Sequence, residues 1–485
     1  MTMKTTMPGK PMFIAGKWVK KEEVIEVLNP QDNSFVSTVP SASKEDLLFA
    51  IGETKEGAKT AAAMPVHQRI SVLYKAAMYI EKNKEEYAAV IALEGSKTIR
   101  EATAEVKRCI QTLRLSAEEA RRINGETISF DQSEGSEDRV GYYYRFPIGI
   151  IAAITPFNDP LNLVAHKVGP AIASGNAIIV KPATVTPISA LLLAEAFEHA
   201  GLPSKILSVI TGKGSVIGDL LVTHPDIRMV SFTGGLETGE RIARKAGLKK
   251  LSMELGSNSP VIVLRDADIP TAVESSVSGA FYAVGQNCLG VQRIYIEEAV
   301  YETFSSLFVK RTHQYKVGDK MLDTTDMGPM INESEAIRVE SWVDEAIDMG
   351  AKLLVGGKRN GAFYSPTVLT DVPPNCTIAK QEVFGPVVLL FPVLDLEMAI
   401  EKSNDVNFGL QAGIFTKDID QAFQAIGKMD VGGIMINDSS DYRIDGMPFG
   451  GVKGSGLGRE GVKFTIQEMT EPRVVSFKLS HKRST

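Results

Sequence analysis

The fold of this chain is decided by the stretch Met229-Val230-Ser231-Phe232-Thr233-Gly234-Gly235-Leu236-Glu237-Thr238-Gly239, which continues as a helical run through Lys245. An apolar run, a glycine-rich turn and a helix in this order are typical of a buried parallel strand and its crossover. Such a turn offers backbone N–H groups and the positive end of a helix dipole to a phosphate. The spacing is Gly-(x)4-Gly and not the usual Gly-x-Gly-x-x-Gly, and glycine-rich turns without a ligand are at least as common.

Similar apolar runs lie upstream and alternate with helical segments, at Gly149–Ile154, Ala177–Val180 and Ile206–Ile210. A doubly wound sheet is the economical interpretation, and its ligand crevice lies at the carboxyl ends of the strands. A second alternation begins at Ser257, with apolar runs at Val261–Leu264, Arg293–Ile296, Val387–Phe391 and Gly433–Ile436. We therefore predict an α/β protein with a Rossmann-like domain and a second α/β domain.

The segment before the first alternation is predicted to be mostly helical. Apolar residues recur at three- and four-residue spacing over Lys44–Met64, Pro65–Asn83 and Glu85–Ile110, with a break near Gly95. Ser43, followed by acidic residues, is expected to cap the first of these helices.

Two further segments are predicted to form an extended arm. The polar stretch Asn124–Arg139 precedes Val140–Phe146 and is expected to form a hairpin that leaves the first domain and returns. The last strand, Arg473–Leu479, has no local partner in the sequence, so we expect it to pair with another subunit.

Size and composition narrow the class of protein. A chain of 485 residues is expected to hold two or three domains, and its net charge of −6 gives no reason to expect nucleic acid or an anionic membrane as partner. The three cysteines, Cys109, Cys288 and Cys376, are too few and scattered for a disulfide framework or a metal site. No apolar stretch reaches the roughly 18 residues of a membrane span, and the N-terminus lacks the apolar core of a secretory signal. We expect a cytoplasmic protein without a metal.

Cys288 is the candidate nucleophile. It lies in Gly285-Gln286-Asn287-Cys288-Leu289-Gly290, where small and polar neighbours indicate a loop that approaches a ligand closely. A thiol attacks as thiolate and needs a proton acceptor, and Glu254 in Met253-Glu254-Leu255-Gly256 is a suitable carboxylate. Most free cysteines are instead small buried core residues, and the flanking sequence is what argues against that alternative here.

Two polar residues follow strands at the predicted crevice. Asn158, in Thr155-Pro156-Phe157-Asn158, could donate to a developing oxyanion, although turn chemistry explains an Asn after Pro at least as well. Lys181 leaves a strand at Val180-Lys181-Pro182-Ala183 and could reach ribose hydroxyls, although an isolated Lys there is usually solvated. The turns Glu382-Val383-Phe384-Gly385-Pro386 and Pro448-Phe449-Gly450-Gly451 are either functional or simple punctuation.

These signals, in this order and spacing, resemble the aldehyde dehydrogenase superfamily from about Met12 to Phe477. Within it, the run Ile436-Asn437-Asp438-Ser439-Ser440 and the run from Met447 through Lys453 to Gly461 are most similar to the branch of lactaldehyde and non-phosphorylating glyceraldehyde-3-phosphate dehydrogenases. The resemblance implies the fold of that family, in which a small β arm mediates oligomerisation. It places the cofactor domain at residues 1–122 and 147–256, the catalytic domain at 257–445, the arm at 123–146 and 468–485, and a return segment at 446–467.

The resemblance also implies a role for each candidate residue. Cys288 would attack the aldehyde to give a thiohemiacetal, Asn158 and the Cys288 N–H would hold the oxyanion, and Glu254 would activate the water that hydrolyses the thioester. Lys181 and Glu382 would hold ribose hydroxyls, and Gly234 and Gly235 would approach the pyrophosphate. The other implied cofactor contacts are Thr155, Phe157, Gly239, Leu255 and Phe384.

Cofactor choice is predicted from Thr184. NAD-preferring relatives typically have a Glu at this position, which faces the ribose 2′-hydroxyl and repels a 2′-phosphate. Thr184 is neutral and can donate a hydrogen bond, and Lys213 adds positive charge nearby. We therefore predict that NADP is preferred and that NAD is the alternative.

Four residues are predicted to contact the substrate tail. In the glyceraldehyde-3-phosphate branch, arginines corresponding to Arg108 and Arg443 hold the phosphate, as their planar forks suit oxyanions; each could equally be paired with a nearby Asp. This chain departs from the branch pattern at Asp159, where a tyrosine is expected, and at Asn287, where an arginine is expected. Both departures weaken the case for a dianionic tail.

The sequence therefore predicts NAD(P)-dependent oxidation of a small, hydroxylated or anionic aldehyde to its acid, by a homodimer or homotetramer. The alternatives are a non-phosphorylating NADP-dependent glyceraldehyde-3-phosphate dehydrogenase and a CoA-acylating semialdehyde dehydrogenase, whose relatives lack the base that Glu254 provides. A non-catalytic structural member of the fold would lack the nucleophile or the base, and both are present.

Overall fold

The computed structural model describes residues 6–480, so the ends of the predicted ranges 1–122 and 468–485 lie outside the described residues. Its first sheet has eight strands in the order β2-β1-β9-β8-β7-β10-β11-β23. The strands are β1 (Met12–Ile14), β2 (Lys17–Val19), β7 (Ile150–Ile154), β8 (Ala177–Lys181), β9 (Leu207–Val209), β10 (Ile227–Thr233), β11 (Lys250–Glu254) and β23 (Gly456–Leu457). β9, β8, β7, β10 and β11 are parallel, and the strand order reverses between β7 and β10. The predicted doubly wound sheet is confirmed, and its switch point lies between these two strands.

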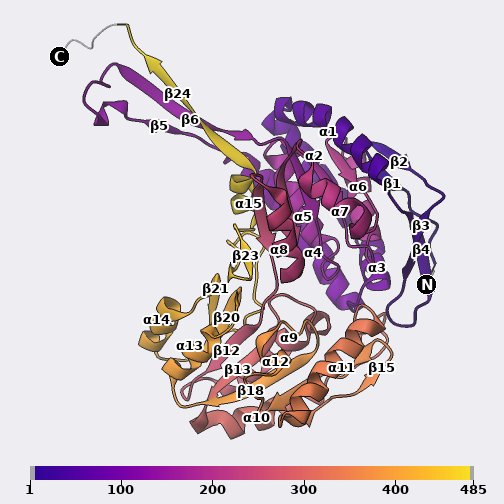
Figure 1. The fold of residues 1–485 in the computed structure, drawn as a ribbon, viewed down its shortest axis with the longest axis vertical. Helices are drawn as coiled ribbons and strands as arrows, with labels where there is room; N and C mark the ends of the chain where they lie inside the picture. The colour runs from indigo at the N-terminus through magenta and orange to yellow at the C-terminus, as the bar shows by residue number, and fades with distance from the viewer. Residues whose placement is uncertain (1–5, 481–485) are drawn as a thin grey trace.

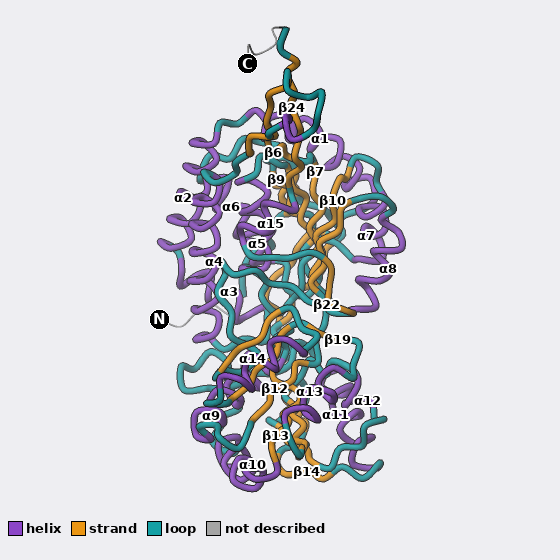
Figure 2. The backbone as a smooth tube through the Cα atoms, turned by 90° about the vertical axis from the view of Figure 1, so that its left-hand side faces the viewer, coloured by secondary structure: helices purple, strands orange, loops and turns teal. Residues whose placement is uncertain are grey.

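Helices cover both faces of this sheet. Figure 2 shows α5 (Asn162–Ala173) and α6 (Ile188–His199) on one side of the strands, and α7 (Gly214–Thr223) and α8 (Leu236–Ala246) on the other. The apolar strand residues are fully buried because both faces are covered.

The N-terminal helices are α1 (Lys44–Ala63), α2 (Val66–Lys82), α3 (Lys84–Glu94) and α4 (Ile99–Ala120). Ser43 caps α1 as predicted, in a capping box with Asp46. The predicted run Glu85–Ile110 is two helices, because the break at Gly95 is followed by a second capping box, Thr98 with Glu101. The prediction ended the second helix too early, since α4 continues to Ala120.

The second sheet has seven strands in the order β14-β17-β18-β13-β12-β20-β21, parallel except for the edge strand β14. Its strands are β12 (Ser259–Val263), β13 (Val291–Glu297), β14 (Lys352–Val355), β17 (Thr367–Thr370), β18 (Val387–Val393), β20 (Gln411–Phe415) and β21 (Gly433–Ile436). Its helices are α9 (Ile269–Phe281), α10 (Glu298–Thr312), α11 (Glu333–Asp348), α12 (Thr377–Lys380), α13 (Leu396–Asn404) and α14 (Ile419–Lys428). The two sheets have separate apolar cores.

A three-stranded sheet, β24-β6-β5, projects from the body of the molecule (Figure 1). The predicted hairpin is confirmed, since β5 (Glu126–Ile128) pairs antiparallel with β6 (Arg139–Pro147). The terminal strand has no local partner, as expected, but it does have a partner elsewhere in its own chain, and its predicted pairing with another subunit stays a prediction. β24 (Thr470–Lys478) pairs with β6 along its whole length, from Thr470 opposite Pro147 to Lys478 opposite Arg139. The two strands are far apart in the sequence, so no local signal reveals the pairing.

The remaining elements are short. They are β3 (Val24–Leu28), β4 (Phe35–Pro40), β15 (Arg359–Asn360), β16 (Phe363–Tyr364), β19 (Phe408–Gly409), β22 (Val452–Lys453) and α15 (Val462–Glu468). Within residues 6–480, no helix combines the length and the apolar composition that a membrane span requires. The predicted domain boundaries and the role of the arm in oligomerisation stay predictions.

Candidate active site

The switch point of the first sheet brings two predicted loops together. Thr155 and Asn158 follow β7, and Thr233 ends β10, the strand hydrogen-bonded to β7, directly before the glycine turn. The hydroxyl oxygens of Thr155 and Thr233 are buried and have no hydrogen-bond partner among residues 6–480. Because buried hydroxyls are normally satisfied, this pair indicates that a polar ligand binds here. Asn158 is half-buried beside them, and its role as an oxyanion donor stays a prediction.

The glycines of the turn differ in their surroundings. Gly239 lies where a Cβ atom would come within 2.4 Å of Leu255 Cδ2, so glycine lets α8 pack closely on the end of β11. Gly235 is the N-cap residue of α8 and faces open space, and the N–H of Gly234 donates to the carbonyl of Glu254 at 3.0 Å. The N-terminus of α8 is therefore open to a phosphate, and the pyrophosphate contact that the resemblance implies for Gly234 and Gly235 stays a prediction.

Lys181, Thr184 and Lys213 lie at the carboxyl ends of β8 and β9, in the same sheet. Lys181 is the last residue of β8, and its Nζ donates to the Pro182 carbonyl at 2.9 Å. Burial lowers the pKa of Lys181 to about 8. The Thr184 hydroxyl donates to the carbonyl of Gly212 at 3.4 Å, so the structure brings Thr184 next to the exposed Lys213.

Glu382 connects the second sheet to this crevice. Its Oε1 accepts the N–H of Ser257 at 2.8 Å, and its Oε2 lies 2.4 Å from the position of a Cβ on Gly256, so only glycine fits there. Burial raises the pKa of Glu382 to about 7, and the Ser257 hydrogen bond opposes the shift. The ring of Phe384 meets the ring of Phe157 edge-on at 5.7 Å, which joins the two predicted cofactor segments.

The loop that carries Cys288 precedes β13. Ala283 and Val284 have left-handed backbone angles (φ 50° and 63°), and the N–H of Ala283 donates to Glu101 Oε1 at 2.8 Å. Gly285 packs on the Gly385 backbone, because a Cβ there would lie 2.2 Å from its carbonyl oxygen. A strained backbone held from both sides is typical of a functional loop.

The Cys288 thiol is half-buried, with Sγ 4.0 Å from the side-chain oxygen of Asn287. That oxygen also accepts the N–H of Leu289 at 3.2 Å, so Asn287 shapes the loop, and its predicted contact with substrate stays a prediction. Burial raises the pKa of Cys288 to about 12, and the Arg443 guanidinium opposes the shift. At neutral pH the resting thiol is therefore protonated and needs a proton acceptor to react.

Glu254, the last residue of β11, is 2% exposed, and neither carboxylate oxygen has a hydrogen-bond partner among the described residues. Burial raises the pKa of Glu254 well above its ordinary value, and the neighbouring Glu460 raises it further, against the opposing charge of Arg443. A desolvated carboxyl without structural partners is typical of a general base.

Phe449 and Gly450 are neighbours of Cys288 and Glu254, respectively. Phe449 packs with Leu289 in a small apolar cluster against which Cys288 lies. The adjacent Gly450 has φ 156°, and a Cβ there would lie 3.0 Å from Glu254 Oε1. The Phe449-Gly450 motif, which the sequence left as either functional or punctuation, therefore lies next to both Cys288 and Glu254, the predicted nucleophile and base.

The predicted tail residues lie in a network of charged side chains. Arg108 Nη2 donates to Asp445 Oδ1 at 2.8 Å, and its Nη1 is 3.8 Å from Asp159 Oδ2. Asp159 also forms an ion pair with the buried Lys97. Arg443 lies over the Phe449 ring, 3.7 Å from its centroid. The alternative weighed for Arg108, pairing with an Asp, is what the structure shows.

Sequence reasoning missed Lys97 and Asp445. Both lie beside segments that it singled out, Lys97 at the helix break after Gly95 and Asp445 two residues after Arg443. A charged residue next to a predicted functional segment was the available signal, but only the fold shows which charges meet.

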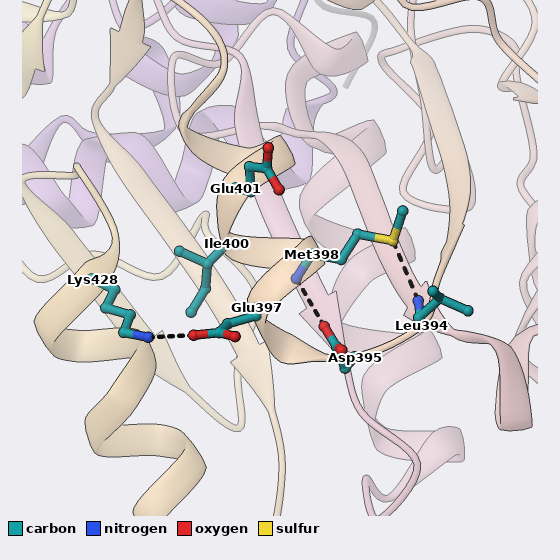
Figure 3. A pocket seen from close by; sticks show the side chains of 7 residues that line it. All are labelled: Leu394, Asp395, Glu397, Met398, Ile400, Glu401 and Lys428. Carbon is teal, nitrogen blue, oxygen red and sulfur yellow. Dashed lines mark hydrogen bonds and ion pairs between the residues drawn. The ribbon is translucent and has the colours of Figure 1, made fainter.

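An open hollow on the surface of α13 and α14 is separate from these residues (Figure 3). It is lined by Leu394, Asp395, Glu397, Met398, Ile400, Glu401 and Lys428, and Lys428 pairs with Glu397 at 2.7 Å. None of the predicted site residues lines it, so it is not the candidate active site.

A family model for the aldehyde dehydrogenase family matches residues 18–475. The chain belongs to the aldehyde dehydrogenase family. It is therefore an NAD(P)-dependent oxidoreductase that acts on an aldehyde.

Similar proteins support the predicted branch of this aldehyde dehydrogenase. Aspartate-semialdehyde dehydrogenase 1 of Pseudomonas canavaninivorans is 50% identical over 454 residues, which cover 94% of this chain and 96% of that protein. The 3-sulfolactaldehyde dehydrogenase of Priestia aryabhattai is 45% identical over 479 residues, 99% of this chain and 100% of that one. The structure of NADP-dependent glyceraldehyde-3-phosphate dehydrogenase from Bacillus halodurans C-125 with NADP aligns with a TM-score of 0.95 at 39% identity, covering 97% and 100% of the two chains.

Proposed function

We propose that this aldehyde dehydrogenase oxidises a small aldehyde with a hydroxylated or singly charged anionic tail to its carboxylic acid, with water resolving a thioester on Cys288. The observation that carries the proposal is the buried, unpartnered carboxyl of Glu254 beside Gly450, with Cys288 against the adjacent Phe449. A base in this place favours hydrolysis over transfer to CoA.

The chemistry of the residues follows in order. The Cys288 thiol loses its proton to a water that passes it to solvent, and Sγ bonds to the aldehyde carbon. The Asn158 amide and the Cys288 N–H donate to the resulting oxyanion. The nicotinamide, when bound, supplies the acceptor for the hydride that leaves this carbon as the carbonyl re-forms. Glu254 then takes a proton from water, the water oxygen bonds to the thioester carbon, and the C–S bond breaks to release the acid.

The cofactor residues support NADP as the preferred cofactor. The Thr184 hydroxyl donates to the carbonyl of Gly212, the residue before Lys213, so a hydroxyl and a cation lie close together with no carboxylate at the Thr184 position. Such a pair favours a 2′-phosphate over a 2′-hydroxyl.

The relatives act on different small aldehydes by their names, aspartate semialdehyde and 3-sulfolactaldehyde, and both of these carry an acidic group. Arg443 is the cation that we assign to such a group in this chain. A phosphate dianion is less favoured, because Arg108 is already committed to Asp445 and Asp159 supplies a repelling carboxylate.

Assembly and location are part of the proposal. Val474 and Phe477 on β24 are 60% and 49% exposed, and an apolar strand on a projecting arm favours contact with a second subunit in a homodimer or homotetramer. The three cysteines are free thiols, which suits the reducing cytoplasm.

The test measures the formation of reduced cofactor at 340 nm with short aldehydes, in variants of Cys288 and Glu254 and in one control variant. Cys288→Ala should abolish oxidation while NADP binding persists, and Cys376→Ala, which removes another free cysteine, should remain active. Glu254→Gln should retain a burst of reduced cofactor and lose steady turnover, because hydride transfer precedes hydrolysis. Steady turnover by Cys288→Ala would refute the assignment of the nucleophile.

A further inference from the structure

Asp159 is a carboxylate placed directly after Asn158, beside the proposed reacting centre. Its side chain is 15% exposed, and its charge, like those of Arg443 and Glu254, influences the thiol of Cys288. The proposed function gives a task to Arg443 and to Glu254 but none to Asp159.

Most of the buried charged side chains around Asp159 form ion pairs with one another. Three carboxylates each lie 2.8 Å from a cation of their own, in the pairs Lys97–Glu105, Arg108–Asp445 and Lys167–Glu460. These three carboxylate side chains are at most 4% exposed. Buried ions need such partners, so these six groups form the structural part of the network.

Asp159 and Arg443 lie outside these three pairs and share ions that belong to them. Asp159 touches Lys97 and lies 3.8 Å from Arg108, but both cations already have a closely paired carboxylate. Arg443 is only 3.5 Å from Glu460, which pairs with Lys167, and its Nε is buried without a hydrogen-bond partner among the described residues. A buried guanidinium N–H without a partner indicates that a ligand supplies the acceptor.

We propose that Asp159 and Arg443 read a tail that carries both an ammonium and a carboxylate, so that the preferred substrate is the semialdehyde of an amino acid. Asp159 accepts hydrogen bonds from the ammonium, and Arg443 donates to the carboxylate. The inference rests on the proposed function and narrows its substrate class. A zwitterionic tail adds no net charge to a balanced network, whereas a carboxylate alone leaves Asp159 as a repelling neighbour.

The test compares two aldehydes that differ only in the ammonium group, L-aspartate β-semialdehyde and succinic semialdehyde, with propanal as a reference for the chemical step. For the wild-type enzyme, kcat/KM should be about ten-fold or more higher for aspartate semialdehyde, the effect of one hydrogen-bonded charge pair. Asp159→Asn should lower this ratio about ten-fold, by losing the ammonium contact and by relieving the repulsion of succinic semialdehyde. The control is Asp348→Asn, the same change on the exposed end of α11, which should keep the wild-type ratio.

A second measurement does not depend on the variant being folded. L-Aspartate and succinate differ in the same way, and L-aspartate should inhibit the wild-type enzyme more strongly against the aldehyde. The inference would be overturned if the wild-type kcat/KM for aspartate semialdehyde were no higher than that for succinic semialdehyde, or if L-aspartate and succinate inhibited equally. It would also be overturned if folded Asp159→Asn kept the wild-type ratio of the two kcat/KM values. Oxidation of propanal that requires Cys288 would leave the proposed function standing in each of these cases, and its absence would remove both.

Discussion

Asp445 is expected to be the most costly single carboxylate to neutralise around the candidate site. Its Oδ1 accepts Arg108 Nη2 and His166 Nε2, both at 2.8 Å, and Asn162 Nδ2 at 3.3 Å. Burial alone would raise the pKa of Asp445, but the His166 hydrogen bond and the Arg108 guanidinium hold it far below its usual range. The ionised form is therefore the one that stabilises the fold.

The substitution Asp445→Asn keeps the shape and removes the charge. A hydrogen bond to a charged group contributes roughly 1 kcal/mol more than a neutral one. Asp445 accepts two short hydrogen bonds and one longer one, so the substitution should lower the free energy of unfolding by about 2–3 kcal/mol, allowing for the exposure of Arg108. The new amide nitrogen also faces the Arg108 Nε donor, which lies 3.4 Å from Asp445 Oδ2.

Asp441→Asn is the matched control, because it makes the same change on the same loop. Burial raises the pKa of Asp441, so its ionised form is disfavoured in the fold. Neutralising it should change the free energy of unfolding by less than about 1 kcal/mol at pH 7, or stabilise the protein.

The two variants should respond to pH with opposite signs. The folded pKa of Asp445 is lowered, so its contribution is complete above the unfolded value of about 3.9 and is lost as pH falls further. The folded pKa of Asp441 is raised, so the wild type loses stability relative to Asp441→Asn as pH rises above about 4.

The assay is chemical denaturation followed by the fluorescence of Trp18 and Trp342, at pH 7 and at pH 3, which lies below the unfolded pKa of Asp445. Trp18 is on β2 of the first sheet and Trp342 is on α11 of the second domain. Because a chain with two cores need not unfold in one step, the midpoint of the first transition is the quantity compared. The reasoning would be refuted if Asp445→Asn lowered the midpoint of the first transition no more than Asp441→Asn does. It would also be refuted if the midpoint change for Asp445→Asn were the same at both pH values.

Four further predictions concern function. Steady-state kcat should rise with pH, because the raised pKa of Glu254 moves the formation of its carboxylate to higher pH, and a flat kcat profile from pH 6 to pH 9 would contradict this. NADP should have the higher kcat/KM and Thr184→Glu should shift preference to NAD; a wild-type kcat/KM about ten-fold higher for NAD would show that Thr184 and Lys213 do not select the 2′-phosphate. Arg443→Ala should raise KM for an anionic aldehyde more than for propanal, and an equal rise would make Arg443 structural. Val474→Asp on the arm should lower the mass found by light scattering, and an unchanged mass would place the subunit contact elsewhere.

Much of the fold could be predicted from local sequence. Apolar runs, glycine turns and the cap at Ser43 were sufficient to place the strands of the first sheet and the start of α1, since each depends on residues close together in the chain. Cys288 and Glu254 were selected by residue type and neighbours, and their roles stay predictions. The structure adds that Cys288 lies against the cluster that contains Phe449 and that Glu254 lies beside the adjacent Gly450.

The sequence by itself determined the parallel strands, the helices between them and the identity of the charged residues. Only the tertiary structure decided which of those charges pair, as in Arg108 with Asp445 and Lys97 with Glu105 and Asp159, and that β24 pairs with β6. The physical reason is that strands and helices follow from neighbours in the chain, whereas a buried charge must find a partner wherever the fold places one. Asp159 and Arg443 stand out as the proposed binding pair only after those partners are known.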